Sequence, residues 1–347
     1  MKKAASRLLR LGLSAIIIAG LVLFGRKVDW HTTWGNIKGA DLEILIAAAA
    51  VNLASLVLKG VRWWIFLRPV GADSLWLAIK ATFAGAGLNN ILVANGGEAA
   101  RVVFVARAAH VQSAKILATL ALERMFELIG YIVMLALSAS FLALPPELTR
   151  WRPIAYIALA GVLALLIFLI RRPETAEVAA AETVAVETWH VRLKAYMKRF
   201  VHTIGGISTG PRFISALLLS VAVWALQVWT YWLTARSAHF NGPDGTPFSL
   251  VGTVAALLAV NLGFAFRATP GNVGVFQAAY ALAAVAFGMD KDQAIAVAFL
   301  IQTQQIIPVT LLGVALAPEF IFKRKKVVRS EDRGLDLHSR VERQEAV

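Results

Sequence analysis

The sequence predicts an all-α, polytopic integral membrane protein. Of its 347 residues, 58% are hydrophobic, and several apolar runs reach or approach the ~20 residues that a helix needs to cross a bilayer. Two glycine-containing motifs, Asn95-Gly96-Gly97-Glu98 and Thr269-Pro270-Gly271-Asn272, interrupt apolar sequence at membrane depth. Backbone that leaves a helix in lipid must be buried in protein or line a wet cavity, because bare amide groups are costly there. We therefore expect full spans combined with broken segments.

The apolar runs give six full spans and two broken or re-entrant hairpins. With a cytoplasmic N-terminus, the first span runs outward and the second runs inward from about Asp41. One hairpin, 75–107, begins and ends on the inner side, and the other, 250–288, begins and ends on the outer side. The six long runs are 11–25, 44–58, 114–144, 154–170, 213–235 and 294–317.

The two halves of the chain are alike. Each contains a broken hairpin that is followed by a long span, and the hairpins open from opposite faces. Laying Asp292 on Ser113 without gaps places Gln302 on Glu123. This arrangement is an inverted repeat, and in transporters the paired broken helices of such repeats mark the substrate site.

The net charge of +14 reflects topology. Most of the lysines and arginines fall on the expected inner side, including Arg62 and Arg101, whereas Lys59, Arg124 and Arg267 lie within or at the edge of the hydrophobic zone. This asymmetry predicts that both termini lie in the cytoplasm, and we expect the protein in the inner (plasma) membrane. The basic excess suits anionic lipid headgroups, and nucleic acid is not an expected partner.

One transmembrane domain is expected over residues 1–322, with a basic and disordered tail over 323–347. Its segment 171–212 is a cytoplasmic connection in which residues 189–202 alternate aromatic and basic side chains. That pattern is typical of an amphipathic helix on the inner leaflet, and a solvated linker helix is the alternative. Tryptophans near the span ends are expected to anchor the membrane interface; they are Trp30, Trp34, Trp63, Trp64, Trp76 and Trp151.

The residues that catalysis or metal binding would need are absent from the expected membrane interior. The chain has no cysteine, and all aspartates and histidines fall in connections, span boundaries or tails. No serine lies in a recognisable arrangement of nucleophile and base. We therefore expect no metal, no cofactor and no enzymatic activity.

Three acids lie at membrane depth: Glu98, Glu123 and Glu127. Helical spacing lets Glu98 pair with Arg101 and Glu127 with Arg124. A charge at the bilayer centre costs at least ~2.5 kcal/mol, so these groups must face the bundle interior. They form either a structural ion-pair cluster or a polar path for a headgroup or coupling ion.

Arg267 has no acid nearby in its own segment, so it needs a glutamate from the first half or an anion from the substrate. One hypothesis is that Arg267 and Arg101 bind a lipid phosphate, aided by helix N-termini after Gly97 and Gly271. Nearby amides supply uncharged donors and acceptors, or simply link helices. The candidate substrate-binding residues are Asn90, Gly97, Glu98, Arg101, Glu123, Arg124, Glu127, Arg267, Pro270, Gly271, Gly274, Gln302 and Gln305.

Two sets of residues resemble a known family. Asn89-Asn90-Ile91-Leu92 leading to Gly97-Glu98 and Arg101, then Glu123-Arg124, is similar to the first-half signature of the lysylphosphatidylglycerol synthase transmembrane region, also called the flippase-like domain family. The run from Pro270 to Phe276 is similar to its second-half signature. Val93 stands where the family often has proline, and Gln277 stands where it often has glutamate.

The resemblance implies translocation of a polar-headed lipid between leaflets, without the soluble domain with which full-length synthases make their product. Membrane lipids with an anionic or phosphate-bearing headgroup are the implied partners, together with a lipid-biosynthesis enzyme. The alternative functions are a non-transporting accessory or lipid-binding protein of an envelope pathway and a membrane-embedded transferase.

Overall fold

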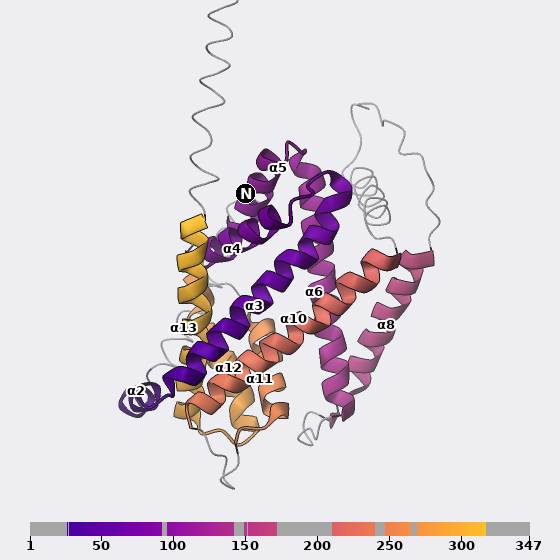
Figure 1. Ribbon diagram of the computed structural model, residues 1–347. Helices are drawn as coiled ribbons and strands as arrows, with labels where there is room; N and C mark the ends of the chain where they lie inside the picture. Colours follow the sequence, from indigo (N-terminus) through magenta and orange to yellow (C-terminus); the bar gives the residue numbers. More distant parts are fainter. Residues whose placement is uncertain are drawn as a thin grey trace, which may run out of the picture.

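The computed structural model describes residues 26, 28–91, 96–141, 149–150, 152–171, 210–239, 247–264 and 269–316. Within these ranges the long elements are all helices (Figure 1), which confirms the all-α prediction. The predictions for the span 11–25, for most of the connection 171–212, for the tail and for Arg267 lie outside the described residues.

The helices follow the predicted runs closely. In the first half they are α2 (Trp30–Lys38), α3 (Leu42–Leu67) with the short η1 (Arg68–Val70), α4 (Leu75–Ile91), α5 (Gly96–Ala108) and α6 (Ser113–Phe141). They continue as α8 (Arg152–Arg171), α10 (Gly210–Ser237), α11 (Leu250–Gly263), η2 (Pro270–Asn272), α12 (Val275–Ala286) and α13 (Lys291–Leu316). The helix α2 was not predicted, because its mixed composition has no long apolar run.

Three helices of the described chain are long and apolar enough to cross a membrane: Leu42–Val70, Pro211–Ser237 and Lys291–Leu316. Two shorter apolar helices, α11 and α12, flank the break predicted at Pro270-Gly271. A helix of this shorter kind falls below the ~20 residues of a full crossing. The described chain thus combines long spans with interrupted ones.

The long span α3 begins where the sequence predicts. The Asp41 carboxylate accepts hydrogen bonds from the backbone N–H groups of Glu43 (2.9 Å) and Ile44 (3.3 Å). Such an N-cap satisfies donors that the first helical turn leaves without partners. The Asp41 N–H donates to the carbonyl oxygen of Ser237 at 2.7 Å, so the start of α3 is joined to the end of α10.

The two hairpins lie at opposite ends of the bundle. Figure 1 shows α4 and α5 at one end and α11 and α12 at the other, with α3 and α10 running between them. The two halves meet where α3 packs on α10 and where α4 packs on α13. Gly87 and Gly313 allow the contact between α4 and α13, because a β-carbon on Gly87 would lie 3.0 Å from the Cα of Gly313. Small residues let membrane helices approach closely.

Each hairpin is packed in its own hydrophobic core. The core of the first half joins α3 and α6 through Phe66 and Phe126, whose ring centroids lie 5.3 Å apart. The core of the second half joins α10 and α12 through Tyr231 and Tyr280, at 6.1 Å. Residues from both halves line the cavity described below.

Candidate functional site

A cavity of about 580 Å³ lies among seven helices: α3, α4, α5, α6, α10, α11 and α13. Several helices contribute residues spaced three or four apart, and such residues share one helix face. The polar and charged lining residues are Asn52, Ser55, Lys59, Arg62, Thr82, Asn89, Asn90, Glu98, Arg101, Glu123, Arg124, Glu127, Tyr131, Trp224, Gln227, Tyr231, Asn261 and Gln305.

The deepest charges form a buried cluster around Glu123. The guanidinium of Arg101 pairs with the Glu123 carboxylate, and Arg62 lies 3.6 Å from the same carboxylate. Arg62 also donates to Ser220 on α10 at 2.9 Å and lies 3.4 Å from Glu127. All of these side chains except Glu127 are nearly completely buried. Partners on several helices therefore compensate the cost of burying these charges.

Trp63 lies beneath the cluster. The Arg101 guanidinium carbon lies 3.6 Å from the centroid of the Trp63 ring, a cation–π contact. The Trp63 indole N–H donates to the Thr119 hydroxyl at 3.0 Å. The prediction that Trp63 anchors the membrane interface is wrong, because its side chain is fully buried. Arg62, which the sequence analysis counted on the inner side, is also fully buried on α3.

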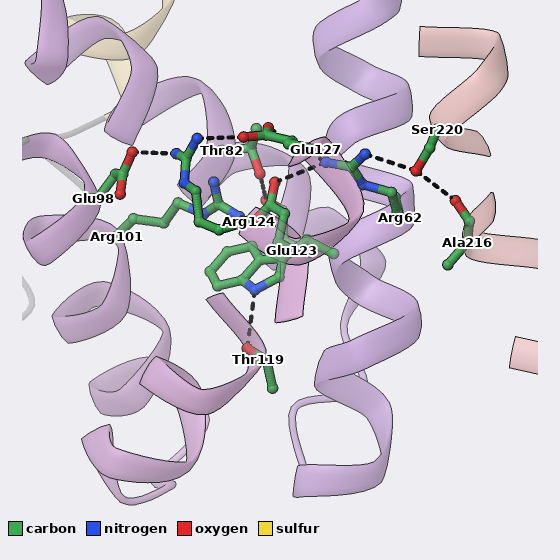
Figure 2. Close-up of polar contacts among 12 residues, drawn as sticks. Arg62, Thr82, Glu98, Arg101, Thr119, Glu123, Arg124, Glu127, Ala216 and Ser220 are labelled. Atoms are coloured by element: carbon green, nitrogen blue, oxygen red, sulfur yellow. Dashed lines mark hydrogen bonds and ion pairs between the residues drawn. The ribbon is translucent and has the colours of Figure 1, made fainter. Parts of the chain in front are cut away.

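A second group of charges lies at a more exposed part of the cavity. Figure 2 shows Arg124 between Glu98 on α5 and Glu127 on its own helix, α6, and it pairs with both. The Arg124 side chain is 45% exposed, against 16% for Glu98 and 25% for Glu127. Leu128, one turn beyond Arg124, also lines the cavity and is exposed. A charged group and an apolar group therefore lie side by side on this face of α6.

The first hairpin is closed by a close backbone approach at Gly97. A β-carbon there would lie 2.0 Å from the carbonyl oxygen of Gly85, so no other residue fits without movement of the backbone. The Gly97 N–H donates to the Asn89 side chain at 2.9 Å, which satisfies one donor at the start of α5. The next residue, Asn90, donates to the Thr310 hydroxyl of α13 at 3.0 Å.

The second hairpin is closed by a chain of amide hydrogen bonds. The Gly274 N–H donates to the Gln277 side-chain oxygen at 2.6 Å, and the Gln277 amide nitrogen donates to Gln302 at 2.6 Å. Gln302 in turn donates to the carbonyl oxygen of Gly271 at 2.8 Å. The backbone here has positive φ at Gly271, Asn272 and Gly274, a conformation that glycine adopts at little cost.

The two breaks approach each other across the contact between α4 and η2. A β-carbon on Gly271 would lie 3.8 Å from the carbonyl oxygen of Asn90, and 3.1 Å from the Ile306 side chain. The end of α4 and the turn of the second hairpin are therefore neighbours inside the bundle.

The structure divides the candidate residues into two groups. The cavity is lined by Asn90, Glu98, Arg101, Glu123, Arg124, Glu127 and Gln305. Gly97, Gly271, Gly274 and Gln302 do not line it: they close the hairpins, and no side-chain position is described for Pro270. The pairing expected between Glu98 and Arg101 is not found, because Glu98 pairs with Arg124 and Arg101 pairs with Glu123.

Sequence reasoning missed several residues of the site, among them Lys59, Arg62 and Trp63. A signal was present, since Asn52, Ser55, Lys59 and Arg62 recur at helical spacing on an otherwise apolar run. This polar stripe was overlooked because charges and tryptophans near a span end are usually interfacial.

Comparison with known proteins agrees with the resemblance in the sequence. The family model described as the lysylphosphatidylglycerol synthase TM region matches residues 8–313. A UPF0104 membrane protein of Pyrococcus horikoshii is 29% identical over 130 residues, which cover 35% of this chain and 39% of that protein.

A second relative, the glycosyltransferase AglD of Haloferax volcanii, is 24% identical over 294 residues, which cover 76% of this chain. The matched regions span 39% and 47% of the lengths of these two curated relatives, less than half in each case.

Proposed function

The chain belongs to the lysylphosphatidylglycerol synthase transmembrane region family, and from this premise we propose that it moves a polar-headed lipid between the leaflets of the inner membrane. The headgroup passes through the cavity while the acyl chains stay in the bilayer. The observation that carries this proposal is the lining of the cavity, which combines charged side chains of the first half with amides from both halves. A polar lining lowers the cost of taking a headgroup through hydrocarbon.

The exposed face of α6 supplies a route for such a lipid. Arg124 and Leu128 are neighbours on one helix face, and both line the cavity. A lipid needs this combination, because its polar headgroup binds to charged side chains and its acyl chains pack against apolar surface. Headgroup entry beside Arg124 keeps the acyl chains against Leu128.

We also propose that the two halves form an inverted repeat. The offset that lays Asp292 on Ser113 also lays Val275, the first residue of α12, on Gly96, the first residue of α5. Their hairpins lie at opposite ends of the bundle (Figure 1). This repeat would have six full spans and two hairpins, with both termini in the cytoplasm, as the distribution of basic residues favours.

We propose that the chain is not an enzyme. Each of the three cavity carboxylates is held by at least one arginine, so none is poised as a free general acid or base. Because the Haloferax relative is named a glycosyltransferase, a membrane-embedded transferase is the second candidate function. That candidate requires turnover of a lipid precursor that is lost in Glu123→Gln.

The test is leaflet exchange by the purified protein in liposomes with fluorescent lipids of several headgroups. Wild-type protein and the control Gly161→Ala, whose β-carbon meets no atom within 4 Å, should both exchange lipid. The variant Arg124→Gln should slow exchange about tenfold, the loss of one charged contact. Absence of exchange by wild-type protein across the whole panel would favour an accessory protein that binds lipid or a biosynthetic enzyme.

A further inference from the structure

The charges that line the cavity do not cancel. Its cationic side chains are Lys59, Arg62, Arg101 and Arg124, and its carboxylates are Glu98, Glu123 and Glu127. With every group ionised, the described lining carries one net positive charge. An excess charge held away from bulk water is costly unless an anion accompanies it.

All of the carboxylates are already paired. Glu123 is held by Arg101 and Arg62, Glu98 by Arg124, and Glu127 by Arg124 and Arg62. A cationic headgroup that entered the cavity would have to displace an arginine to gain a carboxylate. The cavity is therefore poorly suited to an additional cation.

Lys59 is the remaining cation. It lies on α3 one turn before Arg62, yet it forms no ion pair with any residue in the described part of the chain. The Nε atoms of Arg62 and Arg101 are also buried without an acceptor among those residues. Among the cations that line the cavity, Lys59 therefore retains charged donors that an anion can use.

The rest of the lining offers uncharged acceptors. Asn90 and Asn261 use their amide nitrogens on Thr310 and on the carbonyl oxygen of Leu257, which leaves their amide oxygens as acceptors. Asn89, Gln227 and Gln305 add further amides, and Tyr131 and Trp224 add aromatic rings. Hydroxyl groups suit these oxygens, because a hydroxyl can donate to an amide oxygen without bringing a charge.

We propose that Lys59 binds the phosphate of an anionic lipid whose headgroup is otherwise uncharged and bears hydroxyl groups, such as a glycerol or a sugar. One phosphodiester charge cancels the excess charge of the lining. The amides and rings then receive the hydroxyl-bearing part. The cavity discriminates against an aminoacylated, cationic headgroup. This inference rests on the proposed function and names its substrate class.

The test is equilibrium binding to the purified full chain in a neutral detergent, followed by native mass spectrometry. The probes are short-chain phosphatidylglycerol, lysylphosphatidylglycerol, phosphatidylcholine, diacylglycerol and glycerol 3-phosphate. Wild-type protein should bind phosphatidylglycerol about tenfold or more tightly than the other four, the equivalent of one charge-assisted contact. Tighter binding of lysylphosphatidylglycerol would overturn the proposal.

Substitution of Lys59 identifies the residue responsible. Lys59→Gln should weaken phosphatidylglycerol binding about tenfold or more, while Lys59→Arg should restore most of it. The matched control is Lys38→Gln, which removes an exposed cation of α2 outside the cavity and should leave binding unchanged. Equal binding by wild-type and correctly folded Lys59→Gln protein would overturn the assignment. A melting temperature of Lys59→Gln close to that of wild-type protein excludes misfolding as the cause of a loss.

Three further outcomes separate this inference from the proposed function. If glycerol 3-phosphate bound as tightly as phosphatidylglycerol, with the same dependence on Lys59, the site would serve a soluble phosphate and the lipid assignment would fail. If the protein exchanged lysylphosphatidylglycerol in liposomes at least as fast as phosphatidylglycerol, the proposed translocation would be supported and the proposed substrate class would be wrong. Lys59-dependent binding without any exchange would remove translocation and retain the anion site.

Discussion

The two broken hairpins are tied to the helix that follows them by different chemistry. In the first half, α5 is joined to α6 by ion pairs, Arg101 with Glu123 and Glu98 with Arg124. In the second half, α12 is joined to α13 by a neutral amide pair, Gln277 with Gln302. Under the proposed repeat the acids and the amides occupy equivalent positions, since Gln302 is laid on Glu123 and Gln277 on Glu98.

This difference in chemistry indicates that the link in the second half is structural, whereas the link in the first half belongs to the candidate site. The Gln277 and Gln302 amides use both of their oxygens and one nitrogen hydrogen each within the hairpin, so this link is satisfied without water or ligand. Ion pairs are costly to bury in a dry interior. The ion pairs between α5 and α6 do not lie in such an interior, because their residues line the cavity. The first half therefore carries the chemistry, and the second half supplies a neutral wall.

The largest expected effect comes from substituting the glycines of the two hairpins. In Gly97→Ala the new β-carbon would clash with backbone atoms of α4, whereas in Gly271→Ala it would meet the movable end of the Ile306 side chain. We expect Gly97→Ala to abolish stable expression, and Gly271→Ala to cost about 1–2 kcal/mol for its left-handed backbone. The expression yield checks Gly97→Ala and the melting temperature of purified protein checks Gly271→Ala, with Gly161→Ala as the neutral control for both.

The next effect distinguishes the charged link from the neutral one. Glu123→Gln leaves the buried guanidinium of Arg101 without its carboxylate and should cost about 3–5 kcal/mol of unfolding free energy. Gln302→Leu removes hydrogen bonds to Gln277 and Gly271 and should cost about 1–3 kcal/mol. Denaturant unfolding of both variants compares the two links. A larger loss in Gln302→Leu would contradict the view that the first half holds the buried charge.

Arg124→Gln tests whether the exposed charges act in function rather than stability. The Arg124 side chain is 45% exposed, so its two ion pairs should contribute about 1 kcal/mol or less. We expect a melting temperature close to that of wild-type protein together with slower lipid exchange. A loss of stability as large as that of Glu123→Gln, with exchange unaffected, would make Arg124 a structural residue.

The smallest effect lies outside both hairpins, at Asp29, which caps α2. Hydrogen bonds from the hydroxyl and the backbone N–H of Thr32 lower the pKa of Asp29 below its usual value of 3.8. A carboxylate with a lowered pKa stabilises the fold above its unfolded pKa, and this contribution is lost as the pH falls through the folded value. The melting temperature of wild-type protein should therefore fall toward that of Asp29→Asn as the pH drops below about 4. A difference between the two proteins that is constant across this range would contradict the role of the Asp29 charge.

The sequence by itself determined the membrane class, the helix limits and the positions of the breaks. Asp41 marks the start of α3, and glycine and proline mark the interrupted segments, because capping and backbone freedom depend on a few adjacent residues. Apolar runs predict spans for a similar reason, because the length and hydrophobicity of one continuous segment decide whether it can cross the bilayer.

Only the tertiary structure decided which polar groups share the cavity. Glu98 could pair with Arg101 by spacing, yet the crossing of α5 and α6 gives it Arg124 instead. Lys59, Arg62 and Trp63 lie near the end of an apolar run, and their burial depends on how α3 packs against α6 and α10. Which side chains pair depends on how each helix is rotated and how the helices cross. The packing of all the helices together fixes that geometry, so the sequence of one segment alone does not determine it.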